Sequence, residues 1–199
     1  MNKNNKAFAE VIESSLRNWL VQSWEWDEFP AFGSLVTITH GTRTTFGIVY
    51  DIQTGSMDPV RYPFPYKKTH EELLREQPQI FEFLKTTFSC LTIGYQEKGK
   101  IVYQLAPEPP KIHSFVSIAS DDACKEFFYR NNYLHLLFNA SEIAQVDELL
   151  LAILKQYGRL NIATDEKIQE FINTYSLLTG NDYRRMKLFL QRAEHSITL

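Results

Sequence analysis

Residues 32–52, FGSLVTITHGTRTTFGIVYDI, contain two β-type runs joined by a polar turn. The runs at 34–38 and 44–50 are rich in β-branched and aromatic side chains, which fit a pleated and half-buried surface. Residues 40–42, HGT, supply the turn. Gly47 stands where a small closed barrel bends a strand or brings two backbones close together. The stretch predicts a hairpin of a small β-barrel, and it indicates no chemistry.

The composition is that of an ordinary globular protein. Of the 199 residues, 44% are hydrophobic and 23% are charged, with a formal net charge of −3. This charge argues against a general affinity for nucleic acid or anionic lipid. The chain has no apolar run of the ~18 residues that a membrane helix needs, and residues 1–15 lack the apolar core of a signal peptide. We therefore expect a cytoplasmic protein without a membrane span, in which Cys90 and Cys124 are buried free thiols.

The proline content and the predicted secondary structure change near residue 119. All eight prolines lie between Pro30 and Pro110, and helical patterns dominate afterwards. The predicted fold class is α+β. Residues 1–119 form a small barrel with a helical insertion, and residues 120–199 form a small helical domain.

About six strands are expected in the first part. Besides the pair at 32–52, they are predicted at 7–16, 17–24, 86–95, 100–105 and 112–118. An irregular connection at 53–68 leads to the helical insertion at about 69–84. Thr69 and Glu72 form a capping box at its start.

About four helices are expected in the second part. The first begins at Ser120, with Asn131-Asn132 as a candidate break, and Ser141 caps the second, which Gly158 ends. The third runs from Thr164 to Gly180. Asn181 opens the last, with its inward residues at Tyr183, Met186 and Leu190. The helices form either a small bundle or a layer on the barrel.

Residues 94–101, GYQEKGKI, resemble a phosphate-binding loop without being one. They match G-x-x-x-x-G-K-[ST] except at Ile101, which cannot bind Mg²⁺ through a hydroxyl. The motif must also open a helix, whereas a strand-like run follows Gly99. We interpret the segment as a hairpin turn.

No other pattern predicts catalysis, a metal or a cofactor. The five histidines are scattered, and the chain has no Cys-x-x-Cys pair and no G-x-S-x-G motif. We expect a protein that is not an enzyme, although distant residues can be assembled by folding.

Two features are candidates for binding a partner. Trp24, Trp26 and Phe29 lie in an aromatic and acidic segment, which either packs against the barrel or faces a partner. The last helix is basic, and its candidate residues are Arg184, Arg185 and Arg192. They form either a solvated face or a contact with RNA or an acidic protein.

The strands in the first part resemble a HAS-barrel, the module found at the N-terminus of HerA-type translocases and of ATP-synthase subunits. The similarity rests on FGSLVTI at 32–38 and FGIVYDI at 46–52, and it covers roughly residues 8–118. It implies a crown-like element that holds ring ATPases together. Because residues 120–199 predict helices in place of a motor domain, we expect a free-standing barrel without ATPase activity.

Three functions follow as hypotheses. The first is a non-catalytic assembly module that binds a protein, such as a ring ATPase, or itself. The second is a nucleic-acid-binding accessory protein, which requires the basic last helix to share a face with Arg43 and Arg61. The third is an enzyme with a site between barrel and helices, where His113 would meet carboxylates.

Overall fold

The predicted hairpin is present as β3 (Leu35–His40) and β4 (Arg43–Ser56) in the computed structural model. The structure describes residues 6–58, 60 and 64–197, the last three by their backbone alone. Gly41 opens the two-residue turn with φ of 60°, a value that glycine adopts without strain. The ladder continues from the turn to Leu35 opposite Ile48.

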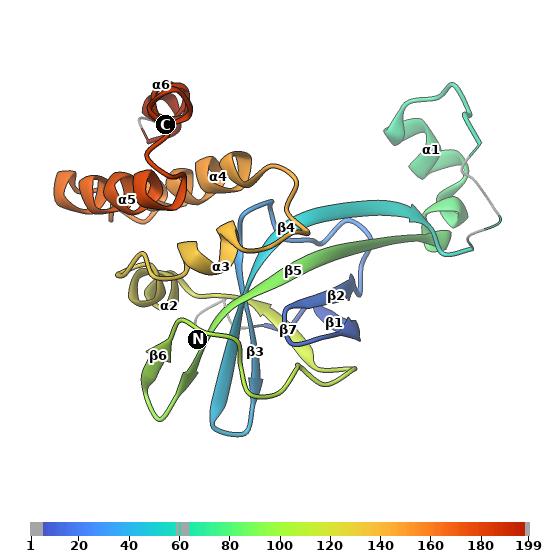
Figure 1. The fold of residues 1–199 in the computed structure, drawn as a ribbon. Coiled ribbons are helices and arrows are strands. Elements are labelled where there is room, and N and C mark those ends of the chain that lie inside the picture. The colour runs from blue at the N-terminus through green and yellow to red at the C-terminus, as the bar shows by residue number, and fades with distance from the viewer. Residues whose placement is uncertain (1–5, 59, 61–63, 198–199) are drawn as a thin grey trace.

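Six antiparallel strands close into a barrel (Figure 1). Their order is β2-β1-β7-β3-β4-β5, and pairing of β2 with β5 closes the ring. The barrel of about six strands that the sequence predicts is thus confirmed. A seventh strand, β6, pairs only with β5 as the return of a hairpin. The other strands are β1 (Ala9–Ser14), β2 (Asn18–Ser23), β5 (Leu84–Glu97), β6 (Lys100–Val102) and β7 (Phe115–Ile118).

Trp19 belongs to the buried cluster of the barrel strands, which also contains Phe8 and Phe88. Trp19 is 1% exposed, and its indole N–H donates to the Thr92 hydroxyl over 3.0 Å. The ladder of β4 on β5 shifts register at Phe46/Gly47. A Cβ at Gly47 would lie 2.2 Å from the Trp19 ring. Gly47 is therefore required because the indole occupies the space of a side chain.

Helices α2–α5 lie on one side of the barrel, α6 packs on α4 and α5 farther from the strands, and two short helical segments lie away from the barrel at the right of Figure 1. The outward side chains of β3, β4 and β5, such as Leu35, Ile48 and Ile93, share one hydrophobic core with the helices. The helices thus form a layer on the barrel. Their bounds are α2 (Asp121–Phe127), α3 (Leu134–Phe138), α4 (Val146–Arg159), α5 (Asp165–Leu178) and α6 (Tyr183–Ile197); the outlying segments are α1 (His70–Glu76) and the 3₁₀ helix η2 (Pro78–Phe83).

Several local predictions are confirmed. Glu72 N–H donates to the Thr69 hydroxyl and Thr69 N–H donates to the Glu72 carboxylate, which is the predicted capping box. At residues 94–101, which resemble a phosphate-binding loop in sequence, β5 and β6 form the predicted hairpin around Lys98 and Gly99, both with positive φ. Cys90 and Cys124 are buried free thiols.

Several strand boundaries differ from the prediction: β6 ends at Val102 instead of residue 105, and β5 runs from Leu84 to Glu97 instead of over 86–95. β4 continues to Ser56, so the predicted irregular connection at 53–68 begins later, because β5 pairs with β4 over its full length. β7 begins at Phe115 rather than at residue 112. His113 has a φ of 64°, and Ser114 N–H donates to the Lys111 carbonyl in a turn, so the regular strand begins only after this turn. His113 N–H and the Ser114 carbonyl still bond to the backbone of Val11 in β1.

The second predicted helix has different ends. It begins after Gln145, without a side-chain cap, instead of at Ser141. Glu142 accepts from Asn18 of the barrel over 2.8 Å, which holds the preceding segment in a turn. The left-handed residue that ends α4 is Asn161, with φ of 56°, while Gly158 lies within the helix.

The helical part has five helices rather than about four, because the candidate break at Asn131-Asn132 separates α2 from α3. The last helix is capped by Asp182, whose carboxylate accepts from Arg185 N–H, and not by Asn181. Tyr183 is 70% exposed instead of inward. Phe189 and Ala193 are the buried residues of α6, since Phe189 stacks on Tyr175 at 4.5 Å.

Pro59, Arg61 and Pro63 lie outside the described residues. In the part of the chain that the structure describes, no helix combines the length and the apolar character needed to cross a bilayer.

Candidate functional site

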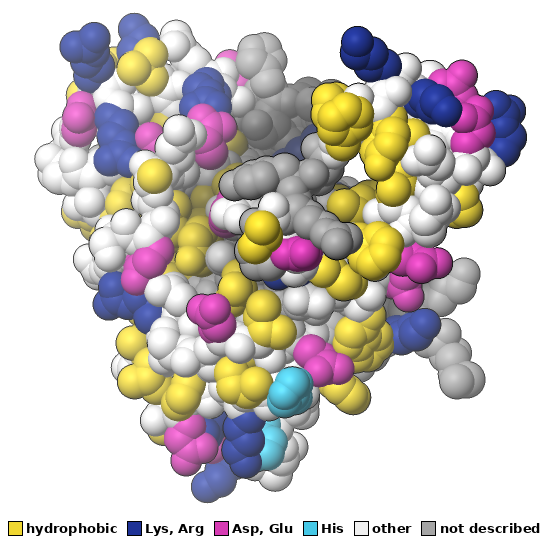
Figure 2. Space-filling view, turned by 90° about the vertical axis from the view of Figure 1, so that its right-hand side faces the viewer, with side chains coloured by type: hydrophobic (Ala, Val, Ile, Leu, Met, Phe, Trp, Pro, Cys, Tyr) yellow, Lys and Arg dark blue, Asp and Glu magenta, His cyan; other side chains and the backbone are white. Residues whose placement is uncertain are grey.

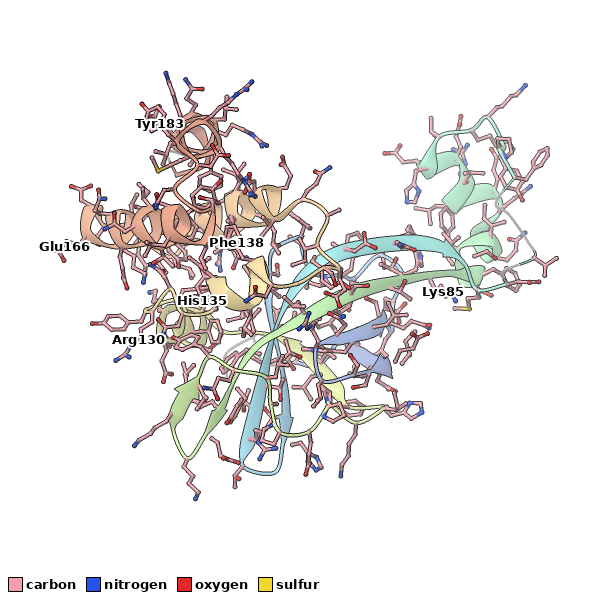
Figure 3. All side chains as sticks on the ribbon, viewed as in Figure 1. Lys85, Arg130, His135, Phe138, Glu166 and Tyr183 are labelled. Carbon is pink, nitrogen blue, oxygen red and sulfur yellow. The ribbon has the colours of Figure 1, made fainter. Side chains whose placement is uncertain are left out.

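Strands β4 and β5 extend beyond the barrel as a two-stranded ribbon. β3 pairs with β4 only as far as Ile48, and β2 pairs with β5 only as far as Thr87. β4 and β5 still pair with each other to Ser56 and Leu84. The described residues between 57 and 83 (57, 58, 60 and 64–83), which contain α1 and η2 at the end of this ribbon, are called the lobe. Lys85 in Figure 3 marks the point where β5 leaves it.

The described residues of the lobe form no hydrophobic core of their own. None of its described residues is buried. Figure 2 looks at the molecule from the side of the lobe and shows hydrophobic side chains there among acidic and basic ones. Six large apolar side chains of the lobe are 38% to 86% exposed, namely Met57, Val60, Phe64, Tyr66, Leu74 and Phe83.

Aromatic contacts attach the lobe to the barrel. Trp26, in the loop after β2, stacks on Phe81 of η2 with ring centroids 5.5 Å apart. His70 of α1 contacts both rings, at 5.0 Å from Phe81 and 6.1 Å from Trp26. The Thr86 hydroxyl also donates to the Trp26 carbonyl. Trp26, predicted as a partner-binding residue, thus has an intramolecular role as the anchor of the lobe.

The other two predicted aromatic residues lie elsewhere. Trp24 is half-exposed on the barrel wall, where its indole N–H donates to Glu10 over 3.1 Å and its ring meets Phe115 edge-on. Phe29 is half-exposed and lines a groove. The structure therefore does not gather Trp24, Trp26 and Phe29 into one patch.

The groove lies between the loop that leads into β3 and helix α4, and its volume is about 1010 Å³. Phe29, Phe32 and Ile118 form half-exposed apolar walls. Lys6 and Lys155 add two exposed ammonium groups, and Arg159 pairs with Asp121 at 3.0 Å on the rim. Cys124 lies at the floor, where burial raises the pKa of its thiol to about 11 and thereby disfavours the nucleophilic thiolate.

The basic last helix uses two of its arginines to bind α4. Arg185 donates to both carboxylate oxygens of Asp147, at 2.8 and 3.0 Å, and this hydrogen-bonded carboxylate raises the pKa of its guanidinium. Arg192 pairs with Glu148 at 2.6 and 2.8 Å. Arg184 is exposed. These pairs orient α6 on α4.

The predicted shared basic face is not formed by the described residues. Arg43 follows the β3–β4 turn, which lies at the end of the molecule opposite α6 (Figure 1), and it pairs with Glu97 at 2.8 Å. Arg61 is outside the described residues. Tyr183, labelled in Figure 3, marks the start of α6 at the opposite end.

The histidines do not assemble a catalytic or metal site in the described part of the chain. His113 is exposed and contacts Glu10 at 3.2 Å, outside the groove between barrel and helices. His40, His70 and His135 are also exposed. Among the described residues, no three potential metal ligands cluster.

Sequence analysis missed the lobe residues and the walls of the groove other than Phe29. A signal for the lobe was available in residues 57–66, MDPVRYPFPY, where apolar side chains alternate with prolines and charges without a helical or strand period. Such side chains have no regular face to bury. The groove leaves no sequence signal, because its walls come from residues near 30, 118 and 155.

No protein-family model matches this chain, and no curated protein matches it either. The structure itself shows a six-stranded antiparallel barrel followed by helices.

Proposed function

We propose that this protein is a non-catalytic assembly module that binds another protein through the lobe. The observation that carries the proposal is the large apolar surface of the lobe combined with the absence of any buried residue among its described ones. Contiguous exposed apolar side chains mark interaction surfaces on soluble proteins. Two-stranded ribbons are also only marginally stable alone, so a partner would stabilise what the ribbon carries.

The resemblance to HAS-barrels supports the same direction. In that family the barrel is a crown element of ring ATPases, and the part of this chain that carries the resemblance does form a closed antiparallel barrel. A ring ATPase is accordingly the first class of partner to test. The arginines of α6 lend less support to nucleic-acid binding, because Arg185 and Arg192 are engaged by α4.

The test compares three forms of the full chain recovered from native lysate, with and without nuclease. The lobe variant is Phe64→Asp/Phe83→Asp. The control is Leu177→Asp on α5, where the side chain is 72% exposed outside the lobe. We expect a nuclease-resistant protein complex with the wild type and the control, and its loss with the lobe variant. A complex that is unaffected by the lobe variant, or that disappears with nuclease, would overturn the proposal.

A further inference from the structure

The geometry points to a second copy of this chain as an occupant of the groove: we infer that the lobe of one copy docks into the groove of another. This inference rests on the proposed function, because it uses the lobe as the binding element. It adds the partner and the surface on which the lobe is received.

The two surfaces agree in character. The groove offers half-exposed Phe29, Phe32 and Ile118, and its volume of about 1010 Å³ is at the upper end of the range for ligand pockets. The lobe offers Leu74 and Phe83, with the other exposed apolar side chains beside them. Docking would remove both apolar surfaces from water at once.

The charges at the two surfaces are opposite. Helix α1 carries Glu71, Glu72 and Glu76 against Arg75, a formal charge of −2 (three acidic, one basic). The charged residues of the groove are Lys6, Lys155 and Arg159 against Glu28 and Asp121, a formal charge of +1 (three basic, two acidic). Complementary potentials fix the register of an interface and accelerate encounter.

The lobe does not fill the groove of its own chain. No described residue of 57–83 lines the groove, and the lobe lies at the outer end of the ribbon (Figure 1). In a two-fold interface each copy presents the same surfaces to the other, so a lobe and a groove on one chain can meet the groove and the lobe of its partner. A two-fold pair would place one lobe in each groove, so that both apolar surfaces of both chains are covered.

The experiment uses two variants and their mixture, analysed by sedimentation equilibrium. The lobe variant is Leu74→Asp/Phe83→Asp, and the groove variant is Phe29→Asp/Phe32→Asp. We expect the wild type to dimerise and each variant alone to dimerise at least about 100-fold more weakly, since carboxylates would enter an apolar contact. The equimolar mixture should regain part of the affinity, because the intact lobe of one variant meets the intact groove of the other. Leu177→Asp serves as the matched control and should dimerise like the wild type.

A second measurement covers the case in which the groove variant fails to fold. A zero-length carboxyl-to-amine cross-linker is applied to a mixture of isotope-labelled and unlabelled wild-type chains. We expect a cross-link between Glu71 or Glu72 and Lys155 that joins one labelled and one unlabelled peptide. The inference is overturned by a monomeric wild type, by a groove variant that dimerises normally, which would indicate lobe-to-lobe contact, or by cross-links only within single chains. If the inference fails while the lysate complex still depends on the lobe, the proposed function survives with a different partner.

Discussion

Phe128 and Phe83 are the same side chain in opposite surroundings. Phe128 is fully buried between Tyr133 and Tyr157, with ring centroids 5.4 and 5.5 Å away. Phe83 ends η2 and is 58% exposed. The body, meaning the barrel with α2–α6, is stabilised by its own cores. The lobe is held by a helix cap, an aromatic stack and a ribbon, none of which buries a large area. We therefore expect the body to supply the stability of the fold and the lobe to contribute little to it, as its proposed role in contact with a partner requires.

The largest effect that tests this difference comes from matched truncations. Phe128→Ala should reduce the free energy of unfolding by about 3–5 kcal/mol, because it leaves a cavity in the core. Phe83→Ala should change it by less than about 1 kcal/mol, as is usual for exposed positions. Urea denaturation followed by circular dichroism measures both. Equal losses would show that the lobe is part of the folding core.

A second pair of substitutions lies on one strand, β4. Gly47→Ala places a methyl group 2.2 Å from Trp19, so the barrel must shift, at a cost of about 1–3 kcal/mol. Gly55→Ala is its counterpart in the ribbon, where no atom lies within 4 Å of the added methyl. There we expect no loss, or a gain of about 0.5 kcal/mol from the stiffer unfolded chain. Thermal unfolding of both variants tests this pair. A destabilised Gly55→Ala variant would mean that the ribbon is packed more tightly around Gly55 than the open space there indicates.

Local features were predictable from the sequence in both the body and the lobe, and contacts between distant segments were not. The Thr69 capping box and the strands of the 32–52 hairpin are local features, so their residues alone determine them. The start of α4 depends on the contact of Glu142 with Asn18, which are 124 residues apart. The groove likewise joins distant segments. The spacing of apolar residues along the chain shows which face of a helix or strand is buried. It does not show which loops meet or which apolar side chains stay exposed.

Alkaline pH should act on the body. The hydroxyls of Tyr133 and Tyr157 lie 2.9 Å apart in the core, and burial raises the pKa of both well above the usual range. In the unfolded chain tyrosine loses its proton near pH 10, while the folded core keeps it. Stability is therefore full below about pH 10 and falls as the pH rises toward the folded pKa. Absorbance of tyrosinate should appear together with unfolding.

Tyr133→Phe/Tyr157→Phe is the control for this alkaline transition. The double variant should move it to higher pH, because two groups that favour the unfolded state at high pH are removed. Ionisation of all tyrosines before unfolding would contradict the assignment.

The smallest effect concerns the lobe alone and has the opposite pH dependence. The hydrogen bonds from Thr69 lower the pKa of Glu72, so the contribution of Glu72 to α1 is present above the unfolded value of about 4.3 and is lost as the pH falls through the folded pKa. Thr69→Ala should likewise weaken α1 by about 1 kcal/mol. Because no described lobe residue is buried, both changes should lower the protection of the amides of residues 70–76, measured as the exchange rate relative to the intrinsic rate at the same pH, and leave global unfolding unchanged. Thr164→Ala removes the matching cap of α5, whose Phe171 and Tyr175 are buried. That variant should lower global stability, so a Thr69→Ala variant that did the same would place the lobe within the cooperative unit of the body.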